Sequence, residues 1–397
     1  MNLSVPFFVR QTLLQVLLFF CMLQGVKAQF IDHFNKQALD QAWTTYTGDG
    51  YATSTFVQGP EHAAFHVDAT HDSLNIWWAI IRRPVEKIDL NKLIKPENEL
   101  RVEARIKVSH APRRVNLHFN HQRTTDFHGN LKEFYIPDTS DWHVISMTTE
   151  AFDVQKGDNI YVQLAMMDWG LEKYEVLIDY IKVEVVKNEM VEKDLGLPLA
   201  YHPEIPKPGE LNEHVPVIQD VTIDKRFTGY NFNGWQDAFS SSGDYINPVG
   251  HGQILIMRAD LTSYKNKQAN GLGLLEMHVY HLERSPDYIK DFGMVRLVEI
   301  IGGPCEWDQE HVTYYTFTAN RDKEIIFNGQ MIIDVDLTET NNKTVYFAIP
   351  EPVIQRLIDG QTRGLALFPL GAVHASFYDS ESENIKVRPI LHFNLKK

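Results

Sequence analysis

Apolar and polar residues alternate in short segments from 29 to about 187, and polar turns separate these segments. In the segment 100–108, apolar residues alternate with charged residues that include Arg101 and Arg105, so a strand here has one apolar and one charged face. Further strands are expected at 74–81, 143–148, 160–166 and 175–186. Turns without long intervening helices favour antiparallel sheets.

The segment 114–120 alternates in the same way but carries different polar residues. Arg114, Asn116, His118 and Asn120 are separated by apolar side chains. We expect this strand and the strand at 100–108 to lie in one sheet, with their polar residues on a single open face. An ordinary solvated face is the alternative, because antiparallel sheets often leave one face in water. The amide and imidazole groups favour a binding role, since solvated strands more often carry Lys, Glu and Thr.

The alternation stops between 188 and 216, where the prolines are Pro198, Pro203, Pro206, Pro208 and Pro216. Proline stiffens a spacer and blocks strand pairing, so this region is predicted to link two folded units, 29–187 and 217–397. In the second unit, strands are expected at 253–259, 272–281, 295–301, 324–327, 331–337, 343–349, 364–367 and 387–393, with a short helix at 350–359. The sequence predicts an all-β protein of two antiparallel β-sandwiches and a Pro-rich linker.

The first 28 residues have the pattern of an export signal. Arg10 precedes an apolar run at 13–22, and Val26-Lys27-Ala28 fits a cleavage site. The run is too short for a bilayer-spanning helix, so no membrane insertion is expected. Loss of Arg10 and Lys27 takes the formal net charge from −14 to −16, which disfavours nucleic acid as a partner. Cys305 is then the single thiol of a secreted or periplasmic protein.

Four segments of the second unit form a recognisable series, which begins with Ile-Leu-Ile-Met-Arg-Ala-Asp-Leu-Thr at 254–262 and continues at 307–313, 364–367 and 376–391. In sequence and in order, these segments resemble DNRLRE-type β-sandwich domains. The resemblance covers most of 217–395, but at 227–247 an aromatic and polar insertion replaces the family's Asn-Tyr-Gly turn. Such domains accompany secreted polysaccharide-degrading enzymes, and some bind anionic polysaccharide such as alginate.

The first unit resembles a jelly-roll carbohydrate-binding module. The similar segments are Phe-Ile-Asp-His-Phe at 30–34, Asp-Trp-His-Val-Ile-Ser at 141–146 and Ile-Asp-Tyr-Ile-Lys-Val at 178–183. Glucanases of related fold need a Glu-x-Asp-x-x-Glu strand, which this sequence lacks. The resemblance implies glycan binding on the concave face of the sandwich.

The polar face supplies the candidate ligand-binding residues. Arginine can clamp a carboxylate or sulfate bidentately, which favours an acidic plant or algal polysaccharide. The residues expected to bind it are Arg101, Arg105, Arg114, Asn116, His118, Asn120 and Trp77. Because Trp77 and Trp78 are consecutive, one belongs to the core and the other is free to stack on a sugar. The chain is thus expected to be an exported polysaccharide-binding protein, with polysaccharide-degrading enzymes as candidate partners.

Two alternatives stay open. The Arg-Val-Glu-Ala-Arg segment at 101–105 resembles the Arg-x-Glu-x-Arg strand of alginate lyases, but the Tyr-Phe-Lys-Ala-Gly strand of that family is absent. In a lyase, side chains neutralise a uronate carboxylate and a base takes the neighbouring proton. The residues for these roles are Arg114, Asn116, His118, Tyr135 and Tyr161. A structural envelope or matrix protein is the other alternative.

No catalytic metal can be assigned from the sequence. A structural calcium ion near Asp32, Asp40 or Asp179 is expected, because sandwich modules often tie their termini together with one.

Overall fold

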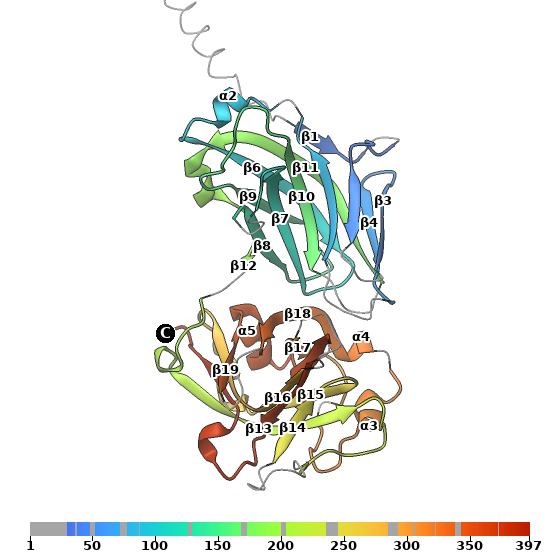
Figure 1. The fold of residues 1–397 in the computed structure, drawn as a ribbon, viewed down its shortest axis with the longest axis vertical. Coiled ribbons are helices and arrows are strands. Elements are labelled where there is room, and N and C mark those ends of the chain that lie inside the picture. The colour runs from blue at the N-terminus through green and yellow to red at the C-terminus, as the bar shows by residue number, and fades with distance from the viewer. Residues whose placement is uncertain are drawn as a thin grey trace, which may run out of the picture.

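The computed structural model describes most of the chain in two β-rich lobes (Figure 1). The described residues are 30–35, 38–47, 52–71, 78–86, 88–125, 129–167, 173–199, 204–235, 245–284, 293–304, 306–321, 323–337, 343–371 and 373–397. The predicted export signal, Trp77 and Cys305 lie outside them. None of the described helices has the length and apolar character needed to span a bilayer.

Two antiparallel sheets form the first sandwich. Sheet 1 has the order β3-β4-β11-β6-β9, with β1 also paired to β11, and sheet 2 has the order β12-β8-β7-β10-β5-β2. The strands of sheet 1 are β1 (Phe30–His33), β3 (Thr53–Gln58), β4 (Ala63–Asp68), β6 (Asn98–Val108), β9 (His143–Thr148) and β11 (Lys173–Lys187). The strands of sheet 2 are β2 (Thr44–Thr47), β5 (Trp78–Pro84), β7 (Arg113–His121), β8 (Leu131–Ile136), β10 (Ile160–Met167) and β12 (Pro198–Leu199). A one-turn helix, α2 (Leu90–Leu93), precedes β6.

The predicted alternation places the core between these sheets. The apolar residues of β6, among them Val102 and Ile106, pack in one buried cluster with Val115, Leu117 and Phe119 of β7. Side chains stand on opposite faces of a strand in turn, so the polar residues of both strands point away from this core.

The predicted linker is partly built into the first sandwich. Residues Asn188–Lys193 form a 3-10 helix, and Pro198–Leu199 then pairs with β8 as the edge strand β12. Proline is tolerated there because an edge strand leaves one row of backbone groups unpaired. The first strand of the second sandwich begins at Glu213, slightly before the predicted boundary at 217.

Ten strands build the second sandwich. Their order is β14-β21-β16-β22-β13-β15-β20-β17-β18, with β19 paired to β16. The strands are β13 (Glu213–Asp224), β14 (Ile246–Val249), β15 (Gln253–Ala259), β16 (Gly273–Arg284), β17 (Gly293–Ile300), β18 (Phe327–Asp336), β19 (Thr344–Ile349), β20 (Gly364–Gly371), β21 (Val373–Tyr378) and β22 (Ile390–Phe393). The helices are α3 (Tyr314–Thr318), α4 (Lys323–Ile326) and α5 (Glu351–Asp359), with 3-10 turns at Pro208–Glu210, Thr262–Tyr264 and Ile385–Val387. The all-β prediction is confirmed, and so is the short helix at 350–359.

Two helices of the second sandwich, α5 and α4, show where local sequence does and does not predict a helix. Helix α5 starts after Pro350, buries Val353 and Ile354, and ends at Gly360, whose φ of 72° suits glycine. The strand expected at 324–327 is wrong, because Lys323–Ile326 forms α4 and β18 begins only at Phe327. The apolar run Ile325–Phe327 has only three residues, and so short a run does not distinguish a helical turn from a strand.

Candidate functional site

The polar residues of β6 and β7 lie on opposite sides of the first sandwich. Strand β6 belongs to sheet 1 and β7 to sheet 2, and the apolar faces of both strands meet in the core between them. The expectation of one shared open face is therefore wrong. Arg101 and Arg105 face outward from sheet 1, whereas Asn116, His118 and Asn120 face outward from sheet 2. Spacing along the chain could not show this, because consecutive strands of a sandwich often cross between sheets.

On the outer face of sheet 1, Arg101 is neutralised by the protein itself. It is buried, and its Nη1 lies 3.0 Å from Glu103 and 3.7 Å from Glu184. Its Nε lies 3.5 Å from Asp194, and its Nη2 donates to Ser146 Oγ at 2.7 Å. Three carboxylates thus balance the charge of this buried guanidinium.

Arg105 of the same face also has an internal partner. Its Nη1 lies 2.6 Å from Asp179 Oδ2, and its guanidinium lies 4.9 Å from the ring centre of Trp142. The carboxylate of Asp179, a predicted calcium ligand, thus forms an ion pair with Arg105.

The outer face of sheet 2 has a different composition. Antiparallel register places His118 opposite Gln163 and Gln163 opposite Arg82, so these side chains form one row across three strands. The neighbouring row pairs Asn120 with Tyr161. We call the outward side chains of Arg82, Asn116, His118, Asn120, Tyr161 and Gln163 the β7–β10 face.

Two amide oxygens on the β7–β10 face are buried without a partner. Asn116 is 2% exposed and Asn120 is 4% exposed, and their Oδ1 atoms have no hydrogen-bond partner among the described residues. Such atoms usually bond to protein or to ordered water, so each marks a position where a donor is missing.

Arg82 forms the cationic part of the face. Its guanidinium lies 3.7 Å from the ring centre of Tyr161 and 5.9 Å from that of Tyr46, which is 46% exposed. Arg82 Nε is buried without a hydrogen bond, and no carboxylate of the described residues forms an ion pair with this side chain. Other arginines of the sandwich do have such partners, namely Arg83, Arg101, Arg105, Arg114 and Arg123.

Arg114 and Tyr135, predicted for ligand or lyase roles, lie in the contact between the two sandwiches. Arg114 pairs with Glu133, and its Nη1 donates to the backbone oxygen of Ile332 at 3.2 Å. The guanidinium of Arg356 lies 5.0 Å from the ring centre of Tyr135. Burial raises the pKa of Glu133. Both predicted residues are buried and contact protein on the second sandwich. Asn116, His118, Asn120 and Gln163 of the β7–β10 face are buried as well, so Arg82 and Tyr161 are the half-buried residues of this face that a ligand can reach.

The carboxylates expected to hold calcium are paired with an arginine. Arg83 Nη1 lies 3.0 Å from Asp40 and 3.6 Å from Asp32, and Trp43 Nε1 donates to Asp32 Oδ2 at 3.0 Å. Arg83 thus sits between these two carboxylates. Calcium here stays a prediction from the fold.

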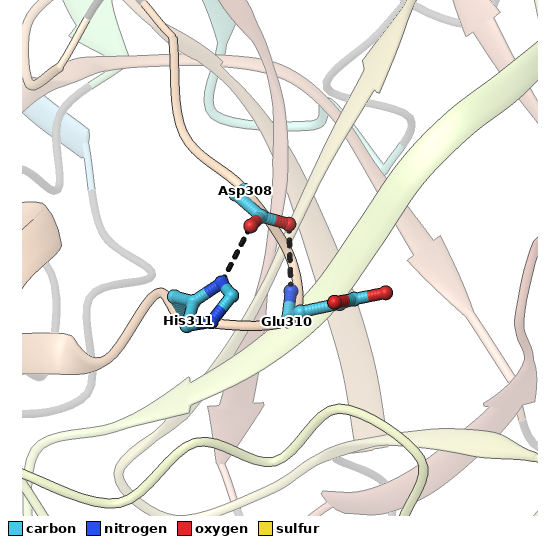
Figure 2. Close-up of side chains that lie close together, drawn as sticks. All are labelled: Asp308, Glu310 and His311. Atoms are coloured by element: carbon cyan, nitrogen blue, oxygen red, sulfur yellow. Dashed lines mark hydrogen bonds and ion pairs between the residues drawn. The ribbon is translucent and has the colours of Figure 1, made fainter.

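Asp308, Glu310 and His311 lie together on the surface of the second sandwich (Figure 2). His311 Nδ1 lies 2.6 Å from Asp308 Oδ2, and the backbone nitrogen of Glu310 donates to Asp308 Oδ1 at 3.0 Å. Its hydrogen bond to Asp308 raises the pKa of His311. This hydrogen-bonded, exposed group is not evidence of a metal site.

Sequence patterns missed Arg82 and Gln163. The strand expected at 74–81 ended one residue before Arg82, whereas β5 runs from Trp78 to Pro84. Gln163 lies within the expected strand 160–166, and its role depends on which strands flank it. Only the order of strands in sheet 2 brings the two residues together.

No protein-family model and no curated protein matches the chain. Among solved structures, a study of carbohydrate-binding modules of the β-sandwich superfamily contains a chain with 15% identity and a TM-score of 0.28, covering 42% of this chain and 64% of that one. The family 11 carbohydrate-binding module of the cellulosomal cellulase Lic26A-Cel5E of Clostridium thermocellum has 13% identity and a TM-score of 0.26, covering 39% of this chain and 95% of that one. A Stig cyclase, Fisc from Fischerella sp. TAU, has 11% identity and a TM-score of 0.27, covering 39% and 94%. Function is therefore argued from the residues of the face.

Proposed function

We propose that this chain binds a polysaccharide on the β7–β10 face of its first sandwich. The observation that carries the proposal is Arg82, a cation stacked on Tyr161 with no carboxylate partner among the described residues. A planar guanidinium offers paired donors, and an aromatic ring beside it offers an apolar surface for a sugar ring.

The ligand is an acidic plant or algal polysaccharide, carrying uronate or sulfate groups. Arg82 pairs bidentately with such a group, and His118 lies in the same row of side chains. The whole chain is negative, at −14, but salt screens charges beyond about 8–10 Å, so the local cation decides the contact. We further propose that the protein is exported and works beside polysaccharide-degrading enzymes.

Binding without cleavage is the form of the proposal that the geometry supports. The lyase alternative assigned the neutralising and proton-abstracting roles partly to Arg114 and Tyr135, which contact the second sandwich instead. A purely structural role does not require an arginine such as Arg82, which stacks on a ring and has no carboxylate partner among the described residues.

The test is affinity electrophoresis of the mature protein through gels containing alginate, pectate, a sulfated galactan or no polysaccharide. We expect slower migration in at least one acidic gel, and Arg82→Ala and Tyr161→Ala should abolish it. Arg105→Ala is the matched control, because Arg105 also lies beside an aromatic ring but has Asp179 as a partner. Equal migration of wild type and Arg82→Ala contradicts the proposal. Appearance of unsaturated uronate absorbance in the same mixtures shows a lyase instead.

A further inference from the structure

A second group of exposed aromatic side chains lies on the second sandwich, in the loop that follows β13. Phe227 is 58% exposed, Tyr230 is 53% exposed and Trp235 is 42% exposed. All three surround the buried ring of Phe232, with ring-centre distances of 6.5, 4.8 and 5.5 Å. We call Phe227, Tyr230 and Trp235 the aromatic platform. Large aromatic side chains are mostly buried in soluble proteins, so three exposed rings around one buried ring require an explanation.

The loop that carries the aromatic platform is held in one shape. Successive turns close it through hydrogen bonds from the backbone nitrogen of Tyr230 to Phe227 and from that of Trp235 to Phe232, at 2.9 and 3.1 Å. Asn231 Nδ2 donates to the backbone oxygens of Gln309 and Val312, at 2.8 and 2.5 Å. Rings held in place before binding lose little conformational freedom when a ligand arrives.

Hydrogen-bonding groups border the aromatic platform. Asn231 ties the loop to the segment that carries Asp308, Glu310 and His311, the exposed group in Figure 2. Tyr315, 54% exposed, belongs to α3, and its backbone nitrogen donates to the backbone oxygen of Thr228 at 2.8 Å. Figure 1 shows α3 low on the second sandwich, away from the first. The segment tied to the loop thus carries two exposed carboxylates, of which Asp308 is hydrogen-bonded to His311. On the platform itself, the guanidinium of Arg226 lies 5.7 Å from the ring centre of Phe227 and is paired with Asp224.

We propose that the aromatic platform is a second glycan-binding site, specific for neutral sugar chains. Tyrosine and tryptophan rings present an apolar face to the C–H groups of a pyranose, and the neighbouring carboxylates accept hydrogen bonds from its hydroxyl groups. Arg226 beside Phe227 is paired with Asp224, and His311 is paired with Asp308, so neither cation is available to a uronate or sulfate. This site and the β7–β10 face therefore select different chains. The proposal does not depend on binding at the β7–β10 face.

The sharpest test compares variants of each site on neutral and acidic polysaccharides. Full-length wild type, Tyr230→Ala/Trp235→Ala and Arg82→Ala are run through gels containing mixed-linkage β-glucan, xylan, galactan or alginate. Ile385→Ala is the control for removing an exposed apolar side chain, since Ile385 is also exposed but lies elsewhere, in the 3-10 turn Ile385–Val387. Thermal melting checks that every variant is folded.

We expect the double variant to weaken binding to at least one neutral polysaccharide about tenfold or more, with alginate binding unchanged. Arg82→Ala and Ile385→Ala should keep the neutral binding. Failure of wild type to bind any neutral polysaccharide overturns the proposal, and so does equal neutral binding by the double variant. A wild type that self-associates in size-exclusion chromatography, beside a monomeric double variant with unchanged neutral binding, assigns the platform to a protein contact instead.

Discussion

The two outer faces of the first sandwich follow the same sequence pattern but differ in how their cations are satisfied. On the outer face of sheet 1, which we call the β6 face, Arg101 contacts Glu103, Glu184 and Asp194. On the β7–β10 face, Arg82 lies on an aromatic ring with no described carboxylate to pair with. Alternation along a strand therefore predicts which side chains leave the core, whereas the neighbouring strands determine whether those side chains can bind something else.

The largest expected effect is on stability and belongs to the β6 face. Arg101→Met leaves three carboxylates around an apolar side chain, and loss of one partner from a buried ionic network costs about 3 kcal/mol. We expect a clear fall in the melting temperature of the first sandwich, with polysaccharide affinity per folded molecule unchanged. Arg105→Met is the control, because that ion pair is partly exposed and contributes little. Loss of binding by folded Arg101→Met contradicts the distinction between the faces.

The second largest expected effect is the salt dependence of acidic polysaccharide binding to the β7–β10 face. Raising NaCl from about 0.05 to about 0.5 M shortens the screening length severalfold and should weaken acidic polysaccharide binding about tenfold. Isothermal titration calorimetry across this range measures the effect. The residual salt dependence of Arg82→Ala should be much smaller. A salt-independent affinity means that the ligand on this face carries no charge.

The same comparison extends to carboxylates, with a smaller expected effect. Asp194 lies beside Arg101 and Lys132, whereas Asp220 of the second sandwich is buried, is bonded to Ser380 and forms no ion pair with a cation of the described residues. Burial, together with the nearby carboxylates of Asp379 and Glu381, raises the pKa of Asp220 from 3.8 to about 7.

Between about pH 4 and pH 7 the folded protein thus keeps Asp220 protonated, whereas the same carboxyl group is ionised in the unfolded chain. Stability should fall as pH rises through this window. We expect Asp220→Asn to remove part of the fall, about 2–4 °C in melting temperature for a domain of this size. Calorimetry at pH 5 and pH 8 measures it, with Asp194→Asn as the control. A melting temperature that rises with pH in this range excludes a neutral Asp220. Some slope should remain in the variant, because burial also raises the pKa of Asp379 to about 6.

The smallest effect is a gain. If pairing is what keeps the β6 face from binding, then Asp179→Asn should release Arg105, which already lies beside Trp142. We expect the affinity for acidic polysaccharide to rise about twofold in the Arg82→Ala background, since exposed ion pairs contribute little. Gel migration measures this rise. No gain means that an unpaired arginine beside a ring is insufficient and that the amides of β7 are needed.

The sequence predicted the strands of the first sandwich better than their arrangement. Alternation identified β6, β7 and the outward side chains of each, because the period of two is local. It did not assign those strands to opposite sheets, since pairing depends on residues far apart in the chain. Trp77, predicted to bind the ligand, lies outside the described residues, and Arg82 entered the site only through its register with Gln163.

The segment that follows β11 determines where this protein can be divided. A fragment ending at Lys187, the predicted boundary, lacks Asp194, whose carboxylate accepts from the backbone of Thr148 and lies beside Arg101 and Lys132. It also lacks the strand Pro198–Leu199 and exposes the edge of β8 to other chains. A soluble expression fragment of the first sandwich should therefore extend past Leu199, even though the prolines invite an earlier stop.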